Sequence, residues 1–161
     1  MKKIIFLFTI AVLSSSCVEP PLQFTEAALN EKVVTIKGSK TTLGEVIRKS
    51  KGKKIFIDVW ASWCADCIEG MPQVKEIQKK YSNTVYVFLS VDKTKEAWKR
   101  GVTKYGLSGR HYFLPQGQKG PFGDFLNSNW IPRYMVLDTD GSIKLFKAKK
   151  ASDERIVEAL K

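Results

Sequence analysis

The sequence predicts an α/β fold in which a mixed β-sheet lies between two layers of helices, a three-layer α/β/α sandwich. Two near-continuous apolar runs, residues 54–60 and 85–91, are typical of strands that are buried on both faces. Each run precedes a segment with helical periodicity, an order that favours parallel strands. Two last runs, 133–137 and 142–146, are joined by the hairpin turn Asp140-Gly141. With 161 residues, 43% of them hydrophobic, the chain suits one domain with a buried core.

The predicted domain begins with a strand over residues 32–36, which a glycine-containing turn follows. Thr42 and Glu45 indicate the start of a helix, with Thr42 as the cap and the Glu45 side chain reaching back to it. We expect this helix to end near Ser50, before a turn rich in lysine and glycine leads into the buried strand 54–60.

The next helix follows the cysteines, where apolar side chains recur with a helical period at Ile68, Met71, Val74, Ile77 and Tyr81. Pro72 falls early in this helix and is expected to kink it. The second buried strand, 85–91, is followed by a helix over residues 95–105, which has its own apolar side.

Residues 107–128 show no clear period and contain several glycines and prolines, which predicts an irregular segment. Its aromatic side chains, together with Trp130, either shape a substrate groove or pin the segment to the core, and the sequence favours neither. After the hairpin, Ser152 is expected to cap a last helix over residues 153–160. The predicted order is therefore strand–helix–strand–helix–strand–strand–helix.

The first residues have the features of an export signal. Lys2 and Lys3 precede the apolar segment 4–13, and small residues lead up to Cys17. The apolar segment is too short to span a bilayer, and its flanks fit a signal better than the alternative, a short buried helix. We therefore predict a signal peptide over residues 1–16.

Cys17 stands where the lipobox of bacterial lipoproteins, which this segment resembles, has the cysteine that carries the lipid. The usual pattern has leucine three positions before that cysteine, whereas this sequence has Ser14 there and Leu13 one position further back. The resemblance implies a lipid anchor at Cys17, and plain cleavage to a soluble periplasmic protein is the alternative. We expect residues 17–31 to form a tether and residues 32–161 to form the domain.

The net charge of +11 raises the question of a polyanionic partner. The lysines are scattered along the chain, and no motif of RNA- or DNA-binding proteins is present. We therefore expect a solvated basic surface and no nucleic-acid partner.

Cys64 and Cys67 are the chemically informative pair, and three static roles fit them poorly. A zinc site needs about four ligands, and the chain adds only His111 to the two thiols. Haem attachment requires histidine directly after the second cysteine, where Ile68 stands. A disulfide across two residues constrains the unfolded chain little. A working dithiol remains, and no metal or other cofactor is expected. His111 has no partner cluster, so a structural or surface role is expected for it.

The position of the pair indicates how such a dithiol works. Cys64 follows a buried strand and lies where a helix begins, so unpaired backbone N–H groups favour its thiolate. We expect Cys64 to be the exposed attacking nucleophile beside Trp63. Cys67, one turn further on, can reach the Cys64 sulfur and resolve the mixed disulfide.

The segment IDVWASWCADC, residues 57–67, resembles the active-site segment of the thioredoxin family, with its tryptophans around the first cysteine. Pro72 matches the family's kink proline, and WIPRY, residues 130–134, resembles its cis-proline loop. The resemblance covers about residues 33–161. Together with the export signal it points to the TlpA/ResA-like branch of exported thiol–disulfide oxidoreductases and implies a thioredoxin fold.

The same resemblance implies roles for residues around the cysteines. Asp58 matches the family's buried acid and takes the proton from Cys67, although a structural hydrogen bond is the alternative role. The bond between Ile131 and Pro132 is expected to be cis. Trp63, Ile131 and Pro132 are then expected to contact the substrate, in part through main-chain hydrogen bonds.

One departure from the family lies between the cysteines, where Ala65 and Asp66 replace the Gly-Pro of thioredoxins. The charge of Asp66 opposes a thiolate at Cys64, which favours a reducing couple. We therefore predict a periplasmic enzyme that reduces disulfides of exported proteins and is recharged by a thiol donor in the membrane. A disulfide-forming oxidase and a non-catalytic binding lipoprotein are the alternatives.

Overall fold

The computed structural model describes residues 19–161, so the predicted signal peptide and Cys17 lie outside the described residues. Its strands are β1 (Lys32–Thr35), β2 (Lys40–Thr42), β3 (Ile55–Trp60), β4 (Val85–Ser90), β5 (Arg110–Phe113), β6 (Arg133–Leu137) and β7 (Ile143–Ala148). The α-helices are α1 (Glu26–Leu29), α2 (Leu43–Arg48), α3 (Ala65–Lys80), α4 (Lys95–Tyr105), α5 (Pro121–Leu126) and α6 (Glu154–Leu160). None of the helices within residues 19–161 combines the length and the apolar character that crossing a bilayer requires.

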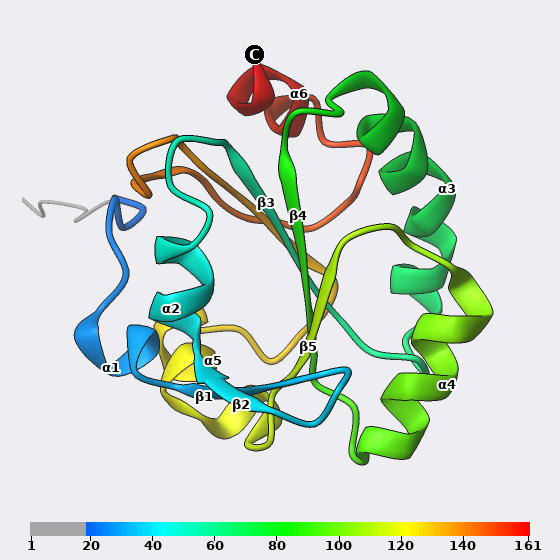
Figure 1. Cartoon of the computed structure of the whole chain (residues 1–161). Coiled ribbons are helices and arrows are strands. Elements are labelled where there is room, and N and C mark those ends of the chain that lie inside the picture. The colour runs from blue at the N-terminus through cyan, green and yellow to red at the C-terminus, as the bar shows by residue number, and fades with distance from the viewer. Residues whose placement is uncertain (1–18) are drawn as a thin grey trace, which may run out of the picture.

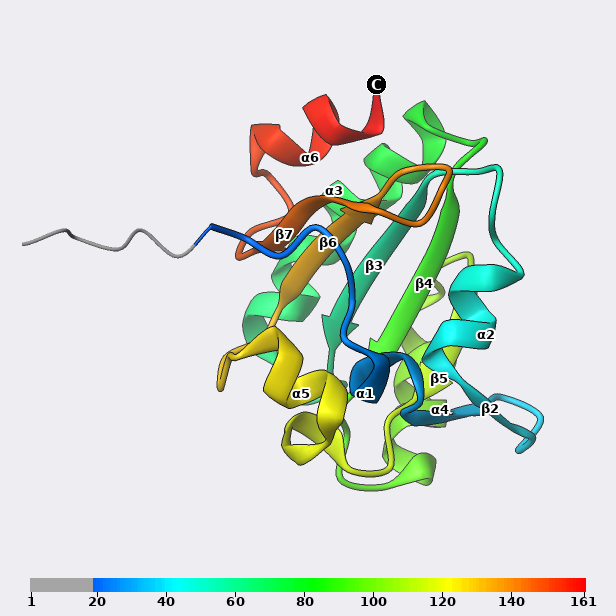
Figure 2. The ribbon, with the colours of Figure 1, turned by 90° about the vertical axis from the view of Figure 1, so that its left-hand side faces the viewer.

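The strands form one sheet in the order β2-β1-β5-β4-β3-β6-β7. Strands β3, β4 and β5 are parallel, and the pairs at both sides of this core are antiparallel. Helices α3 and α4 lie on one face of the sheet, and α1, α2 and α5 lie on the other (Figure 1, Figure 2). The predicted three-layer sandwich with a mixed sheet is therefore confirmed.

Strand β3 lies between β4 and β6 in the sheet, and all six of its residues are buried. It pairs in parallel with β4 and antiparallel with β6. Because helices cover both faces of these strands, an apolar sequence without alternation is required there. The carboxyl ends of the parallel strands β3 and β4 lie at the same end of the sheet. The loop with the cysteine pair follows β3 at that end.

The segment predicted as irregular, residues 107–128, contains β5, a 3₁₀ turn (Gly117–Lys119) and α5. Strand β5 has only four residues, three of which are polar or half-buried, so it shows neither an apolar run nor a clear alternation. It pairs with β4 on one side and β1 on the other. These long-range pairings make it a strand, and the local sequence contains no signal of them.

The predicted tether, residues 17–31, differs from what the structure describes at its C-terminal end. Phe24 and Ala28 are buried, and the Phe24 ring lies 5.0 Å from that of Phe125 in α5. The buried carboxylate of Glu31 accepts the backbone N–H of Phe122 at 2.6 Å. This stretch therefore packs against the segment 107–128, because its apolar side chains find a surface there.

The helix caps agree with the sequence in part. The Thr42 hydroxyl accepts the Glu45 N–H at 3.2 Å, as predicted. The Glu45 carboxylate does not reach back to the cap, because it forms an ion pair with Arg48 instead. The last helix is capped by Asp153, which accepts the Arg155 N–H, and not by Ser152. A carboxylate is an equally good cap and also pairs with the Arg155 guanidinium.

Candidate active site

The cysteine pair lies at the amino end of α3. Cys64 is the N-cap residue, and its sulfur accepts the backbone N–H of Cys67 at 3.2 Å. Cys67 lies in the first turn, and the two sulfurs are joined in a disulfide whose Cα atoms are 5.3 Å apart. The unpaired N–H groups and the positive end of the helix dipole therefore act on the Cys64 sulfur, which is the one that they stabilise as a thiolate.

The prediction that Cys64 is exposed was wrong for this disulfide form, because only 6% of the residue is accessible. Trp63 beside it is 59% exposed, so the tryptophan and not the cysteine forms the surface. The carbonyl oxygen of Ile131 lies 3.7 Å from the Cys64 sulfur and covers it from the far loop. A partner must therefore reach a sulfur that is largely covered in this form.

The loop before Cys64 is held in place by the segment after β4 and by α4. The Asp92 carboxylate accepts both the N–H and the hydroxyl of Ser62, at 3.1 and 2.7 Å. The Tyr105 hydroxyl lies 3.5 Å from the Ser62 carbonyl oxygen. Gly101 packs so closely that an added Cβ would meet the Ser62 Cβ at 2.7 Å. Sequence reasoning missed these anchors, because only tertiary contacts bring them to the loop.

The loop opposite the sulfurs contains the cis peptide bond between Ile131 and Pro132 that the resemblance implies. Ile131 is buried beside Cys64, whereas Trp130 is 59% exposed. Of the other aromatic side chains considered for a groove, Phe113 and Phe122 are buried and Phe125 is half-buried. These three therefore pack into the fold, and Trp130 alone of the set faces solvent beside the cysteine site.

Asp58 lies on β3, the strand that leads to the cysteine loop, and is only 3% exposed. Its Oδ1 has no hydrogen-bond partner within residues 19–161, so the structural bond considered as the alternative role is not formed by this atom. Burial raises the pKa of Asp58 to about 8, because the interior solvates the charged form poorly. A carboxyl group with this pKa can both accept and release a proton near neutral pH.

Tyr134 is a polar neighbour that sequence reasoning missed. It pairs with Asp58 in the register of β3 and β6, and its hydroxyl has no hydrogen-bond partner in the described part of the chain. Burial, and after it the Asp58 charge, raises the pKa of Tyr134. Gly70 of α3 leaves the hydroxyl its space, since an added Cβ would lie 2.8 Å from it.

His111 lies away from this site, on β5. Its ring stacks on Phe88 at 4.8 Å, and its Nε2 is 2.9 Å from the Leu107 carbonyl oxygen. Burial lowers the pKa of His111, which favours the neutral ring. Among the residues that the structure describes, no three histidine, cysteine, aspartate or glutamate side chains come together as a metal site would require.

The site combines a cysteine pair at a helix start, a cis-proline loop next to the first sulfur and a buried acid on the strand that leads to the pair. Together these features define a thiol–disulfide exchange protein on a thioredoxin fold. The chain belongs to the thioredoxin-like family, whose sequence profile matches residues 52–143.

Its relatives carry the same chemistry in their names. The chain is 30% identical over 126 residues to the thiol-disulfide oxidoreductase ResA of Bacillus thuringiensis (strain Al Hakam). The alignment covers 76% of this chain and 68% of that protein. It is also 28% identical over 130 residues to the thioredoxin-like protein YneN of Bacillus subtilis (strain 168). That alignment covers 78% of this chain and 72% of YneN. The solution structure of a Bacteroides vulgatus protein assigned as a thiol-disulfide oxidoreductase is 35% identical, with a TM-score of 0.68 over 84% of this chain and 87% of that one. The protein is a thiol–disulfide oxidoreductase with Cys64 and Cys67 as its CxxC pair.

Proposed function

We propose that this oxidoreductase acts outside the cytoplasm and reduces disulfides of exported proteins. The observation that carries the proposal is the Cys64 sulfur at the amino end of α3, where it accepts the Cys67 N–H. This position favours the thiolate, which is the form that attacks a disulfide. The alternative role, a non-catalytic binding lipoprotein, does not require a cysteine sulfur at the amino end of a helix.

The proposed reaction consists of two exchanges. In the first, the Cys64 thiolate attacks one sulfur of the substrate disulfide, so that a Cys64–substrate bond forms and the second substrate sulfur leaves as a thiolate. In the second, Cys67 attacks the Cys64 sulfur, which closes the enzyme disulfide and releases the remaining substrate cysteine. The substrate gains two electrons, the enzyme loses two, and two thiols replace one disulfide.

In this scheme Asp58 accepts the proton of Cys67 during the second exchange. The raised pKa of Asp58, about 8, keeps its proton affinity close to that of a cysteine thiol, so transfer between the two is nearly balanced. The proton can then pass to the departing substrate thiolate. Asp58 is therefore proposed as a catalytic residue that sits behind the sulfurs.

The substrate is proposed to bind across Trp63, Ile131 and Pro132. The exposed Trp63 ring offers an apolar surface next to the disulfide. Pro132 has no N–H to donate, and the cis bend brings the Ile131 carbonyl group against the Cys64 sulfur. An extended substrate segment can pair with such a loop through its main chain.

The reducing direction is proposed from Asp66, which lies in the first turn of α3. Its negative charge close to Cys64 opposes the thiolate and makes the dithiol form less stable, so that the couple becomes more reducing. Each turnover leaves the enzyme disulfide closed, and a thiol donor in the membrane is proposed to reopen it.

The location is proposed from the first residues of the sequence. Lys2, Lys3 and the apolar segment 4–13 favour export, and Cys17 is the proposed site of a lipid anchor. The chain continues from there into residues that pack on the fold, so an anchor at Cys17 would hold the domain close to a membrane surface. Mass spectrometry of the membrane fraction tests this proposal, because acylation of Cys17 adds lipid mass that Cys17→Ala removes.

Two measurements test the function. Equilibrium with glutathione gives the potential: a value below about −200 mV supports a reductant, and a value near about −120 mV, typical of disulfide-forming enzymes, supports the oxidase. Expression of Cys67→Ser should trap exported proteins on Cys64 as mixed disulfides, because the second exchange cannot occur. The double variant Cys64→Ser, Cys67→Ser is the control and should trap none.

A further inference from the structure

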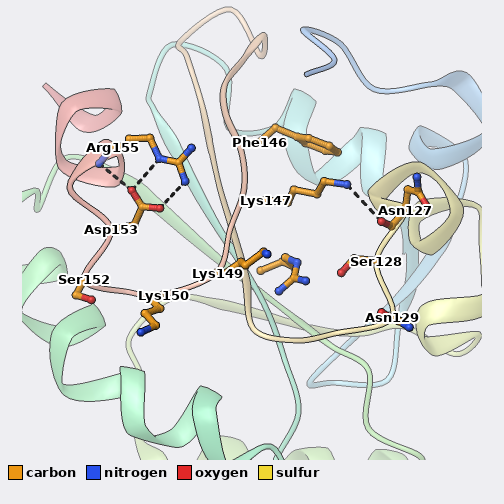
Figure 3. Close-up of a pocket in the computed structure, with 11 residues that line it drawn as sticks. Asn127, Ser128, Asn129, Phe146, Lys147, Lys149, Lys150, Ser152, Asp153 and Arg155 are labelled. Atoms are coloured by element: carbon orange, nitrogen blue, oxygen red, sulfur yellow. Dashed lines mark hydrogen bonds and ion pairs between the residues drawn. The ribbon is translucent and has the colours of Figure 1, made fainter. Parts of the chain in front are cut away.

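A basic hollow of about 900 Å³ lies beside the cis-proline loop, between the segment after α5 and the start of α6 (Figure 3). Its cationic lining consists of Arg133, Lys147, Lys149, Lys150 and Arg155. Among the described residues that line it, Asp153 is the one carboxylate, and it is paired with Arg155 at 2.6 Å. The remaining four cations therefore face the hollow without a negative partner in its wall.

Arg133 is the unusual member of this set. Only 6% of it is accessible, although it carries a full positive charge. Its Nη1 donates to the carbonyl oxygen of Pro132 at 2.8 Å, and its Nε has no partner in residues 19–161. A buried guanidinium without a carboxylate among residues 19–161 costs free energy, and an anion that reached it would offset part of that cost.

Lys147 is held in position by the chain opposite. Its Nζ donates to the carbonyl oxygens of Leu126 and Asn127, at 3.1 and 3.3 Å, and Figure 3 shows the side chain reaching across to Asn127. Asn129 adds a neutral side-chain donor to the same wall, whereas the Ser128 hydroxyl donates to the Trp130 carbonyl oxygen at 3.1 Å. The hollow therefore presents charged and neutral hydrogen-bond donors, which match the oxygen atoms of carboxylates.

A second hollow of about 540 Å³ lies next to this one, beside the first turns of α3. It is lined by Trp130 and Pro132 on one side and by Asp66, Glu69, Gly70 and Gln73 of α3 on the other. The two hollows share Lys149, Lys150 and Ser152 in their walls, so they are neighbours. A peptide segment that lies over the cis-proline loop at the sulfurs can therefore continue into the basic hollow.

We propose that the basic hollow binds an acidic segment of the substrate protein, a few residues away from the cysteine that reacts with Cys64. This inference rests on the proposed function, whose substrate class it narrows to disulfides with acidic residues nearby. The buried Arg133 favours a peptide over an anionic membrane surface, because a flat bilayer cannot reach a guanidinium that is enclosed by the fold. Charge complementarity then adds affinity and speeds encounter.

The binding test uses two fluorescent peptides with serine in place of cysteine, one flanked by aspartate and glutamate and the other by asparagine and glutamine. We expect the oxidised full chain to bind the acidic peptide at least about tenfold more tightly in fluorescence anisotropy. The ratio of the two affinities should fall toward one in the double variant Lys149→Gln, Lys150→Gln. It should stay unchanged in the control double variant Lys51→Gln, Lys53→Gln, which loses the same charge from exposed lysines elsewhere.

Arg133→Gln, checked for folding by thermal unfolding, should lose the preference as well. Equal binding of both peptides would overturn the inference, and so would a preference that the Lys149, Lys150 variant keeps. Loss of binding to phosphatidylglycerol vesicles in that variant, without a peptide preference, would assign the hollow to the membrane instead. Reduction of cysteine-containing versions of the peptides is a separate readout, so failure of the proposed function is distinguishable from failure of this inference.

Discussion

Replacing Asp58 by asparagine tests the link between burial and proton transfer. The substitution keeps the shape of the side chain and removes its ability to ionise. Because Asp58 is 3% exposed and its Oδ1 lacks a partner in the described chain, the charged form is poorly solvated in the folded protein. The variant should therefore be more stable than wild type at neutral pH and slower in the second exchange.

The size of the stability effect follows from the pKa of Asp58, which burial raises from its ordinary value of 3.8 to about 8. Between these values the folded protein holds a proton that the unfolded chain has released. The free energy of unfolding of wild type then falls by about 1.4 kcal/mol per pH unit. The contribution of Asp58 to the free energy of unfolding is fully present below pH 3.8, and it is lost as the pH rises toward 8. At pH 7 the loss is about 4 kcal/mol, an upper bound because the interior relaxes around the charge.

The assay is urea unfolding of the oxidised full chain, without thiols, between pH 4 and pH 8. The difference in free energy of unfolding between Asp58→Asn and wild type should grow with pH, and comparison across pH cancels the constant cost of the buried amide. Glu158→Gln, which changes an exposed carboxylate, is the control and should follow wild type. Release of substrate from the mixed disulfide with Cys64 should slow by about 100-fold in Asp58→Asn.

A pH-independent difference between Asp58→Asn and wild type would show that Asp58 is ionised in the folded protein. Its pKa would then be too low for the nearly balanced proton transfer that is proposed between Asp58 and Cys67. An unchanged rate of the second exchange in Asp58→Asn would contradict the catalytic role even if the stability effect were found.

Three further predictions concern the packing and the surface of the site. Phe24→Ala should lower the free energy of unfolding by about 3 kcal/mol in urea, whereas Gln23→Ala, an exposed control, should change it little; equal effects would contradict packing of this stretch. Glu31→Ala should cost about 1–3 kcal/mol, measured in the same way, because the Phe122 N–H loses its buried acceptor. Trp130→Ala should change stability by less than about 0.5 kcal/mol and slow the reduction of protein disulfides more than that of a small disulfide such as cystine; uniform slowing would argue against a substrate contact.

The elements that the sequence by itself determined are those with a strong local pattern. The apolar runs of β3 and β4 identify strands that are buried on both faces, and α4 begins and ends at the predicted residues. The position of Cys64 at a helix start follows from the same local order, and so does the turn of the last hairpin. These features depend on side chains within a few residues of one another, which is the range that periodicity and caps can report.

The tertiary structure alone decided the environment of the cysteine pair. It placed Tyr134 opposite Asp58, buried Arg133 without a carboxylate, and packed the stretch around Phe24 against a segment almost a hundred residues away. It also covered Cys64 with a distant carbonyl group. Desolvation, charge pairing and long-range strand pairing depend on which distant groups the fold brings together, and that information lies in no single window of the sequence.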